Sequence, residues 1–323
     1  MGRVSRGTER EWQESGRVLL QRAAVLAEVG AVLEGWGAGT QAELADRMER
    51  SIGRALAGRG GTRGPAEERQ HPAQDGRQSL RALAGQDLSG GHWPVVWLAS
   101  DRSGTATLAV ALGSDGDRRV VGLWSGGQAQ VRMAQTIALD LRQRGLNRGE
   151  GWLAITECGR ALEQALREQW GGALWVGHDQ AGVRRTVLAH LPTPERTAAD
   201  DAMRQAWDAP GVVSARQALG ELSDRWADRY PGASERLAKE IEATTMVQEL
   251  GVHGALTLRL RSVAPAGYLL EHGLAFARGC TGSARLEAVA GELLRRQEHF
   301  RHLPAAERGG LEALVQKLQG AGV

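Results

Sequence analysis

The fold is indicated most clearly by residues 94–125, which read PVVWLASDRSGTATLAVALGSDGDRRVVGLWS. This stretch contains three short apolar runs, PVVWLAS, TATLAVALG and RVVGLWS, and polar turns rich in Asp, Ser and Gly separate them. Short runs rich in Val, Leu and Trp are typical of strands, and turns of this length join antiparallel neighbours. We therefore predict an antiparallel meander of three strands.

Two helix–strand pairs follow the meander. Residues 128–144 place apolar side chains at helical spacing, and the apolar run GWLAIT at 151–156 is placed most simply as a strand beside the first one. A second helix over 160–169 and the run ALWV at 173–176 complete another crossover, for which a right-handed connection is expected. This order predicts an α/β protein with a ribonuclease H-like mixed sheet.

The rest of the chain is divided by its composition and periodicity. The predicted parts are an N-terminal helical arm (1–58), a flexible linker (59–78), the ribonuclease H-like core (79–183), an all-helical insertion (184–255) and a C-terminal helical part of the core (256–323). The linker is expected because its Gly, Pro, Arg and Gln residues include no apolar anchors that could offset the entropy of ordering. Within the last part we expect an extended stretch around Leu256–Arg261 and then two helices.

Composition limits the class of protein. With 323 residues and a hydrophobic share of 42%, the chain is expected to be globular, and it has no apolar stretch long enough to span a membrane. The first residues, MGRVSRGTEREWQESGR, contain no apolar run typical of a signal peptide, so the expected location is the cytoplasm. Two cysteines, Cys158 and Cys280, are too few for a disulfide framework or a zinc site, so any metal would be held by oxygen.

The basic residues are almost all arginine. Only Lys239 and Lys317 are lysine, and the net charge is +2. Arginine suits phosphate recognition, but a GC-rich genome raises Arg, Ala and Gly together. Arginine content by itself therefore does not indicate nucleic-acid binding.

Several blocks along the chain match one family in order and spacing. They are RALAGQDLSG, TLAVALGSDGDRRVVGLWSG, RTVLAHLP, MRQAWDAP, DRYPGASERL, TTMVQELGVHGALTLRLRS and AVAGELLRRQEHFR. Over about residues 80–319 the chain resembles Mutator-type insertion-sequence transposases. The resemblance implies a DDE enzyme that binds the double-stranded DNA ends of its element as a homo-oligomer and transposes them by phosphoryl transfer with Mg²⁺ or Mn²⁺. The residues before 80 have no visible match to the family's N-terminal DNA-binding region.

Only one of the family's three catalytic acids corresponds to an acidic residue in this chain. The Asp-Gly pair that ends the first strand corresponds to Ala99 and Ser100, the second Asp to Glu157, and the last Glu to Gly267. Two-metal phosphoryl transfer needs several carboxylate oxygens, because hard cations must stabilise both the entering and the leaving oxygen. The resemblance therefore implies an enzyme with a degenerate active site.

Neighbouring acids are the candidates to replace the lost ones. Asp101 lies two residues after Ala99 and would share its face in a continuing strand, although a solvated turn residue is the alternative. Glu271 lies one helical turn, about 5.4 Å, beyond Gly267. The candidate catalytic residues are thus Glu157, Asp101 and Glu271, and the candidate metal ligands are Glu157 and Asp101. Glu157 could instead be an exposed acid that favours the start of a helix.

The family's Cys/Asp-x-x-His signature corresponds to Asp179 and Gly182, so its histidine is missing. Arg184 and Arg185 match basic residues of the family and, together with Arg261, are candidate DNA contacts. Arginine pairs on a helix are also commonly solvated.

Two functions follow from these residues. The first is a DNA transposase that is inactive or impaired, with Mg²⁺ or Mn²⁺ if it is active and no cofactor otherwise. The alternative is a non-catalytic DNA-binding or structural protein derived from a transposase. The family's functional residues are missing at Ala99, Gly182 and Gly267 together, while the pattern of core residues is retained. This combination predicts little or no strand transfer.

Overall fold

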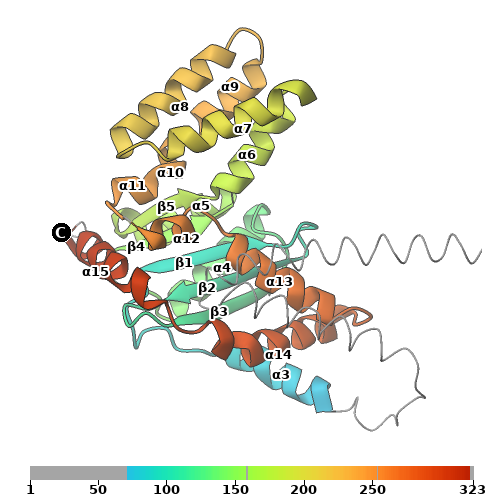
Figure 1. The fold of residues 1–323 in the computed structure, drawn as a ribbon. Coiled ribbons are helices and arrows are strands. Elements are labelled where there is room, and N and C mark those ends of the chain that lie inside the picture. The colour runs from blue at the N-terminus through green and yellow to red at the C-terminus, as the bar shows by residue number, and fades with distance from the viewer. Residues whose placement is uncertain (1–70, 158, 253, 321–323) are drawn as a thin grey trace, which may run out of the picture. The chain divides into compact units, whose positions relative to one another are not determined.

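Five strands form one mixed sheet in the order β3-β2-β1-β4-β5 (Figure 1). In this computed structural model the described residues are 71–157, 159–252 and 254–320, and they belong to one compact unit, residues 66–323. The predicted arm, residues 1–58, and linker residues 59–70 lie outside the described residues.

The predicted meander is confirmed. Strands β1 (Val95–Ser100), β2 (Ala106–Leu112) and β3 (Arg118–Ser125) pair antiparallel in sequence order. The residues of β2 are all buried, as expected of an apolar strand between two neighbours.

The predicted place of the fourth strand is confirmed as well. Strand β4 (Trp152–Thr156) runs parallel to β1, and β5 (Leu174–His178) runs parallel to β4. Because β1, β4 and β5 point the same way, their carboxyl ends meet at one edge of the sheet. The α/β class predicted from the sequence is therefore confirmed.

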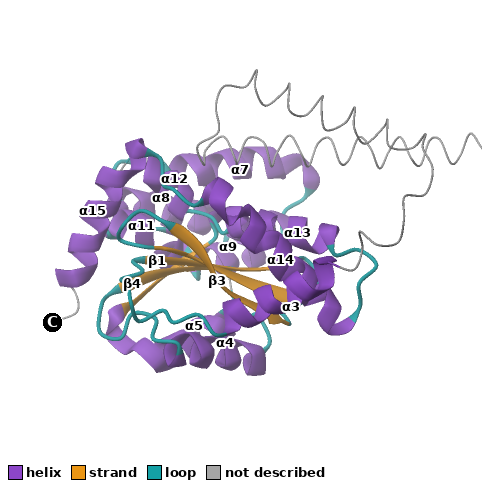
Figure 2. Ribbon diagram, turned by 90° about the horizontal axis from the view of Figure 1, so that it is seen from below, coloured by secondary structure: helices purple, strands orange, loops and turns teal. Residues whose placement is uncertain are grey.

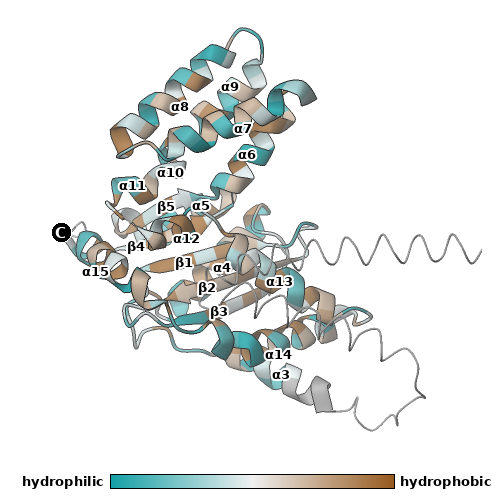
Figure 3. Ribbon diagram, viewed as in Figure 1, coloured by the Kyte–Doolittle hydropathy of each residue, from teal (hydrophilic) through white to brown (hydrophobic). Residues whose placement is uncertain are grey.

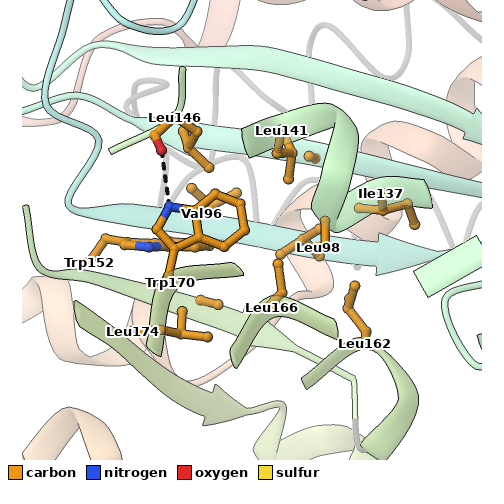
Figure 4. Close-up of a cluster of buried hydrophobic side chains, with 14 of the residues drawn as sticks. Val96, Leu98, Ile137, Leu141, Leu146, Trp152, Leu162, Leu166, Trp170 and Leu174 are labelled. Carbon is orange, nitrogen blue, oxygen red and sulfur yellow. Dashed lines mark hydrogen bonds between the residues drawn. The ribbon is translucent and has the colours of Figure 1, made fainter. Parts of the chain in front are cut away.

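One face of the sheet is covered by α4 (Val131–Gln143) and α5 (Arg160–Trp170), which also pack on each other (Figure 2). The Trp170 indole donates to the Leu146 carbonyl oxygen at 3.0 Å and meets the Trp152 ring edge to face. A short 3₁₀ helix, Gly171–Ala173, leads from α5 into β5. The cluster between sheet and helices is built mainly from branched aliphatic side chains, among them Val96, Leu98, Ile137, Leu141, Leu162 and Leu166 (Figure 4).

The other face is covered by α13 (Ala264–Phe276), which packs on β1 and β2, and by α14 (Gly282–Phe300), which packs on β3. Helix α3 (His71–Ala84) packs along α14, so the linker prediction is wrong for residues 71–78. The two helices approach closely at Gly76, where a Cβ atom would lie 2.6 Å from the Glu287 carbonyl oxygen. Contact with α14, and not an apolar stripe of its own, stabilises this part of α3.

The chain between β5 and α12 is helical, as predicted. It contains α6 (Gln180–Ala189), α7 (Thr193–Trp207), α8 (Val212–Trp226), α9 (Pro231–Ala238), α10 (Ile241–Thr244) and α11 (Met246–Glu249). Hydrophilic and hydrophobic residues alternate around α7 and α8 (Figure 3), and their apolar sides share a buried cluster with α6 and α9. The division of the chain into core and insertion stays a prediction.

The expected extended stretch at Leu256–Arg261 is wrong. Residues Ala255–Leu260 form helix α12, which packs against α15 (Ala305–Gly320). The sequence LTLRL alternates like a strand, but Leu256 and Leu260 also stand four residues apart, and both are fully buried. Gly254, with a φ of 74°, is the N-cap of the helix, and the buried Arg259–Glu307 ion pair fixes the helix to α15.

Across the described ranges, no helix has the length and apolar character needed to cross a bilayer.

Candidate functional site

The three positions that correspond to the catalytic acids converge at the carboxyl edge of the sheet. Leu98 pairs with Thr156 across β1 and β4, so Ala99 and Glu157 follow side by side. Helix α13 crosses β1 at this point, and a Cβ atom at Gly267 would lie 3.9 Å from the Ala99 Cβ. We call these residues, with Ser100, the sheet-edge site: Ala99, Ser100, Glu157 and Gly267. It contains a single carboxylate.

Glu157 is held by hydrogen bonds from two other segments. Its Oε1 accepts from the Ser100 backbone N–H at 3.2 Å, and its Oε2 accepts from Nε2 of Gln128 at 2.9 Å. Burial raises the pKa of Glu157; these two hydrogen bonds oppose the rise, the charge of Asp179 adds to it and that of Arg185 opposes it. Glu157 therefore lies at the site, half-buried, and not at an exposed helix start.

Gln128 is a residue of this site that sequence reasoning missed. Its side chain is buried, and Nε2 also donates to the Leu98 carbonyl oxygen at 3.3 Å. Its backbone N–H donates to Ser100 Oγ at 3.2 Å. A glutamine after Gly126 and Gly127 carries no signal in the sequence that separates it from an ordinary loop residue.

Asp101 closes the β1–β2 hairpin. Its carboxylate accepts from the backbone N–H groups of Thr105 at 2.6 Å and Ala106 at 2.7 Å, and from the backbone and hydroxyl of Ser103 and the hydroxyl of Thr105. Burial raises the pKa of Asp101, but these hydrogen bonds outweigh it and hold the pKa below its usual value. Asp101 is thus a turn residue, and a buried one, whose oxygens are occupied by its own hairpin.

Glu271 is directed to the same turn. Its Oε1 accepts from the Arg102 backbone N–H at 3.1 Å, and it stands on α13 one turn beyond Gly267, as the sequence suggested. Within the described residues, no group of three or more His, Cys, Asp or Glu side chains is arranged to hold a metal ion. Asp101, Glu157 and Glu271 therefore do not combine into a ligand set, and the sheet-edge site does not fit two divalent cations.

Asp179 links the end of β5 to the segment before α13. It caps α6 by accepting from the Gly182 N–H at 2.7 Å, and its other oxygen accepts from Ser262 Oγ at 2.7 Å and from the Val263 N–H at 3.3 Å. Gly182 stands where the family has histidine, and a Cβ atom there would lie 2.9 Å from Asp179 Oδ2. A larger residue at 182 would therefore require the cap to shift.

The three arginines predicted to contact DNA have different surroundings. Arg184 makes a bidentate ion pair with Asp200 at 2.5 and 2.7 Å. Arg261 pairs with Asp208 at 2.6 Å and donates to the Trp207 carbonyl oxygen. Arg185 is exposed, and its charge lowers the pKa of Glu157. Arg185 therefore presents its charge near the sheet-edge site.

His178, also missed from the sequence, joins the sheet to two helical segments. Its Nδ1 lies 2.5 Å from Glu240 Oε2, and its Nε2 lies 3.5 Å from Glu163 Oε2. Burial lowers the pKa of His178, but the two glutamates raise it to about 9, and contact with His178 lowers the pKa of Glu163 to about 2. Both ring nitrogens face carboxylates, so this histidine stabilises the fold and is not available to the sheet-edge site.

Comparison with known proteins identifies the matching region. Residues 99–251 match the family model for transposases of the Mutator family. A comparison with curated proteins finds no match. The matched region begins at Ala99, includes Glu157 and Asp179, and ends before Gly267.

Proposed function

Because the chain belongs to the Mutator family of transposases through residues 99–251, we propose that it is a transposase derivative that binds double-stranded DNA and does not cut it. The order and directions of the strands support a ribonuclease H-like core for this protein. Assembly as a homo-oligomer on DNA ends is part of the proposal and rests on the family resemblance.

The observation that carries the proposal is the convergence of Ala99, Glu157 and Gly267 with one carboxylate among them. A divalent cation is hydrated strongly, and several anionic oxygens are needed before their attraction outweighs the cost of dehydration. Ala99 and Gly267 supply no oxygen from a side chain. Asp101 and Glu271 face the β1–β2 turn. Asp179, whose charge acts on Glu157, uses its oxygens for the α6 cap and for Ser262 and Val263.

DNA binding is supported by the family and by charge at the site. Exposed arginine next to a site that has lost acidic groups attracts phosphate without a bridging cation, because Coulomb attraction to the DNA backbone does not depend on base sequence. Arg185 meets this description. An active transposase is the second candidate, but in the part of the chain that the structure describes, no group of three or more His, Cys, Asp or Glu side chains is arranged to hold a metal ion.

The experiment incubates the purified full chain with supercoiled plasmid and with short duplexes in Mg²⁺ or Mn²⁺. We expect salt-dependent duplex binding without nicking, and Arg185→Ala should weaken binding several-fold more than Arg225→Ala, an exposed control on α8. Metal-dependent nicking that Glu157→Gln abolishes would overturn the non-cutting assignment. Failure to bind any duplex at low salt would overturn the DNA-binding assignment.

A further inference from the structure

The loop between β3 and α4 enters the sheet-edge site through one side chain. We infer that the Gln128 carboxamide occupies the place beside Glu157 that a catalytic cation would have to take, and that it locks the site in a form without metal. Gln128 is then a positioning residue for Glu157. The inference deepens the proposed loss of metal chemistry and rests on it.

Each oxygen of the Glu157 carboxylate accepts a hydrogen bond. Oε1 faces the Ser100 N–H, and Oε2 faces the Gln128 amide nitrogen at 2.9 Å. The amide hydrogens carry partial positive charge and so play the electrostatic part of a cation. A cation that approaches Oε2 from the side of Gln128 would have to displace this nitrogen.

Gln128 cannot swing away without breaking other contacts. The residue is 2% exposed, its Nε2 also donates to the Leu98 carbonyl oxygen, and its backbone N–H donates to Ser100 Oγ. The preceding glycines are held too, since Gly126 N–H donates to the Thr105 carbonyl oxygen at 2.8 Å. The amide nitrogen is therefore held by two acceptors, and a third hydrogen bond holds the backbone of Gln128.

Gly127 shows how tightly the loop fits. A Cβ atom there would lie 3.0 Å from the Gly104 Cα, so the loop is pressed against the β1–β2 turn. The loop that carries Gln128 and the turn that Asp101 closes thus pack as one unit. Displacement of Gln128 by a cation would disturb both.

The geometry also predicts how metal binding could be created. In an octahedral Mg²⁺ or Mn²⁺ site, ligand oxygens about 2.1 Å from the ion lie about 3 Å from each other. Gln128→Glu would put an oxygen where Nε2 now lies, 2.9 Å from Glu157 Oε2. The two carboxylates would repel each other without a cation and would suit a cation as neighbouring ligands.

The experiment measures thermal unfolding of the full chain in EDTA and in millimolar Mn²⁺, without DNA. We expect the Tm of the unaltered protein to be the same in both solutions. Gln128→Glu should lower the Tm in EDTA by about 3–6 °C, and Mn²⁺ should restore most of that loss. The matched control is Gln130→Glu, because Gln130 is exposed in the same loop and its side chain makes no cap hydrogen bond.

A second variant, Gln128→Met, keeps the length of the side chain and removes its hydrogen bonds. It should lower the Tm, and Mn²⁺ should not restore the loss. This variant tests the inference if Gln128→Glu does not fold. An unchanged Tm in Gln128→Met would overturn the inference. So would a Mn²⁺-dependent rise in the Tm of the unaltered protein that Glu157→Gln removes. These outcomes are measured without DNA, so failure of this inference can be distinguished from failure of the proposed DNA binding.

Discussion

Raising the pH from 7 to 10 should weaken the fold at the buried His178. The imidazole lies between Glu240 and Glu163, and these carboxylates hold its pKa at about 9, against an ordinary value of 6.5. Arg236 pairs with Glu240 and Arg167 pairs with Glu163, so each glutamate also has an arginine partner beside the histidine. The contribution of this cluster between pH 7 and 10 is therefore assigned to the histidine.

The size and sign of the effect follow from linkage. A histidine whose pKa is raised in the folded state stabilises that state fully below its unfolded pKa, and the contribution is lost as pH rises through the folded pKa. For a shift from 6.5 to about 9, the loss between pH 7 and 10 is about 2–3 kcal/mol. Glu163, with its pKa lowered to about 2, acts at the acid end: its contribution is present above about 4.5 and is lost as pH falls through about 2.

The assay is urea unfolding at pH 7 and pH 10 for the unaltered chain, His178→Gln and His299→Gln. His299 is an exposed histidine on α14 and serves as the control. The unaltered chain and His299→Gln should each lose about 2–3 kcal/mol more than His178→Gln over this range. Equal pH dependence in all three proteins would refute the reasoning.

Three further results are expected. Asp101→Ala should lower the free energy of unfolding by about 1–3 kcal/mol in urea titrations, because the backbone donors of the β1–β2 turn lose their acceptor; an unchanged value would show that water replaces the carboxylate. Arg259→Met should cost about 3–5 kcal/mol by leaving Glu307 buried without its partner, and the double variant with Glu307→Leu should recover much of the loss; no recovery would contradict this account. In calorimetric titration, manganese should bind the triple variant Ala99→Asp, Glu157→Asp and Gly267→Glu, and it should not bind when any one of these three changes is made alone. Equal binding by the starting protein would refute the assignment of the three positions.

Local sequence determined most of the secondary structure of this chain. The alternation of apolar runs and turns in 94–125 predicted the three-stranded meander, and helical periodicity predicted α4 and α5, because the period of the apolar residues reflects which side of an element faces the core. The pattern failed where it was ambiguous or absent. LTLRL at 256–260 fits both a strand and a helix, and residues 71–78 have no apolar stripe.

The family blocks identified Ala99, Glu157 and Gly267 as the positions of the catalytic acids, but from the sequence they were three separate sites. Only the tertiary structure brought them together and showed that Asp101 belongs to its hairpin. The hydrogen-bond partners of Glu157 and His178 were also set by the tertiary structure, because they are distant in the sequence. Gln128 is 29 residues from Glu157, and Glu240 is 62 residues from His178. Such contacts have no local signature, since a polar side chain finds its buried partner only after the packing of sheet and helices has excluded water from both.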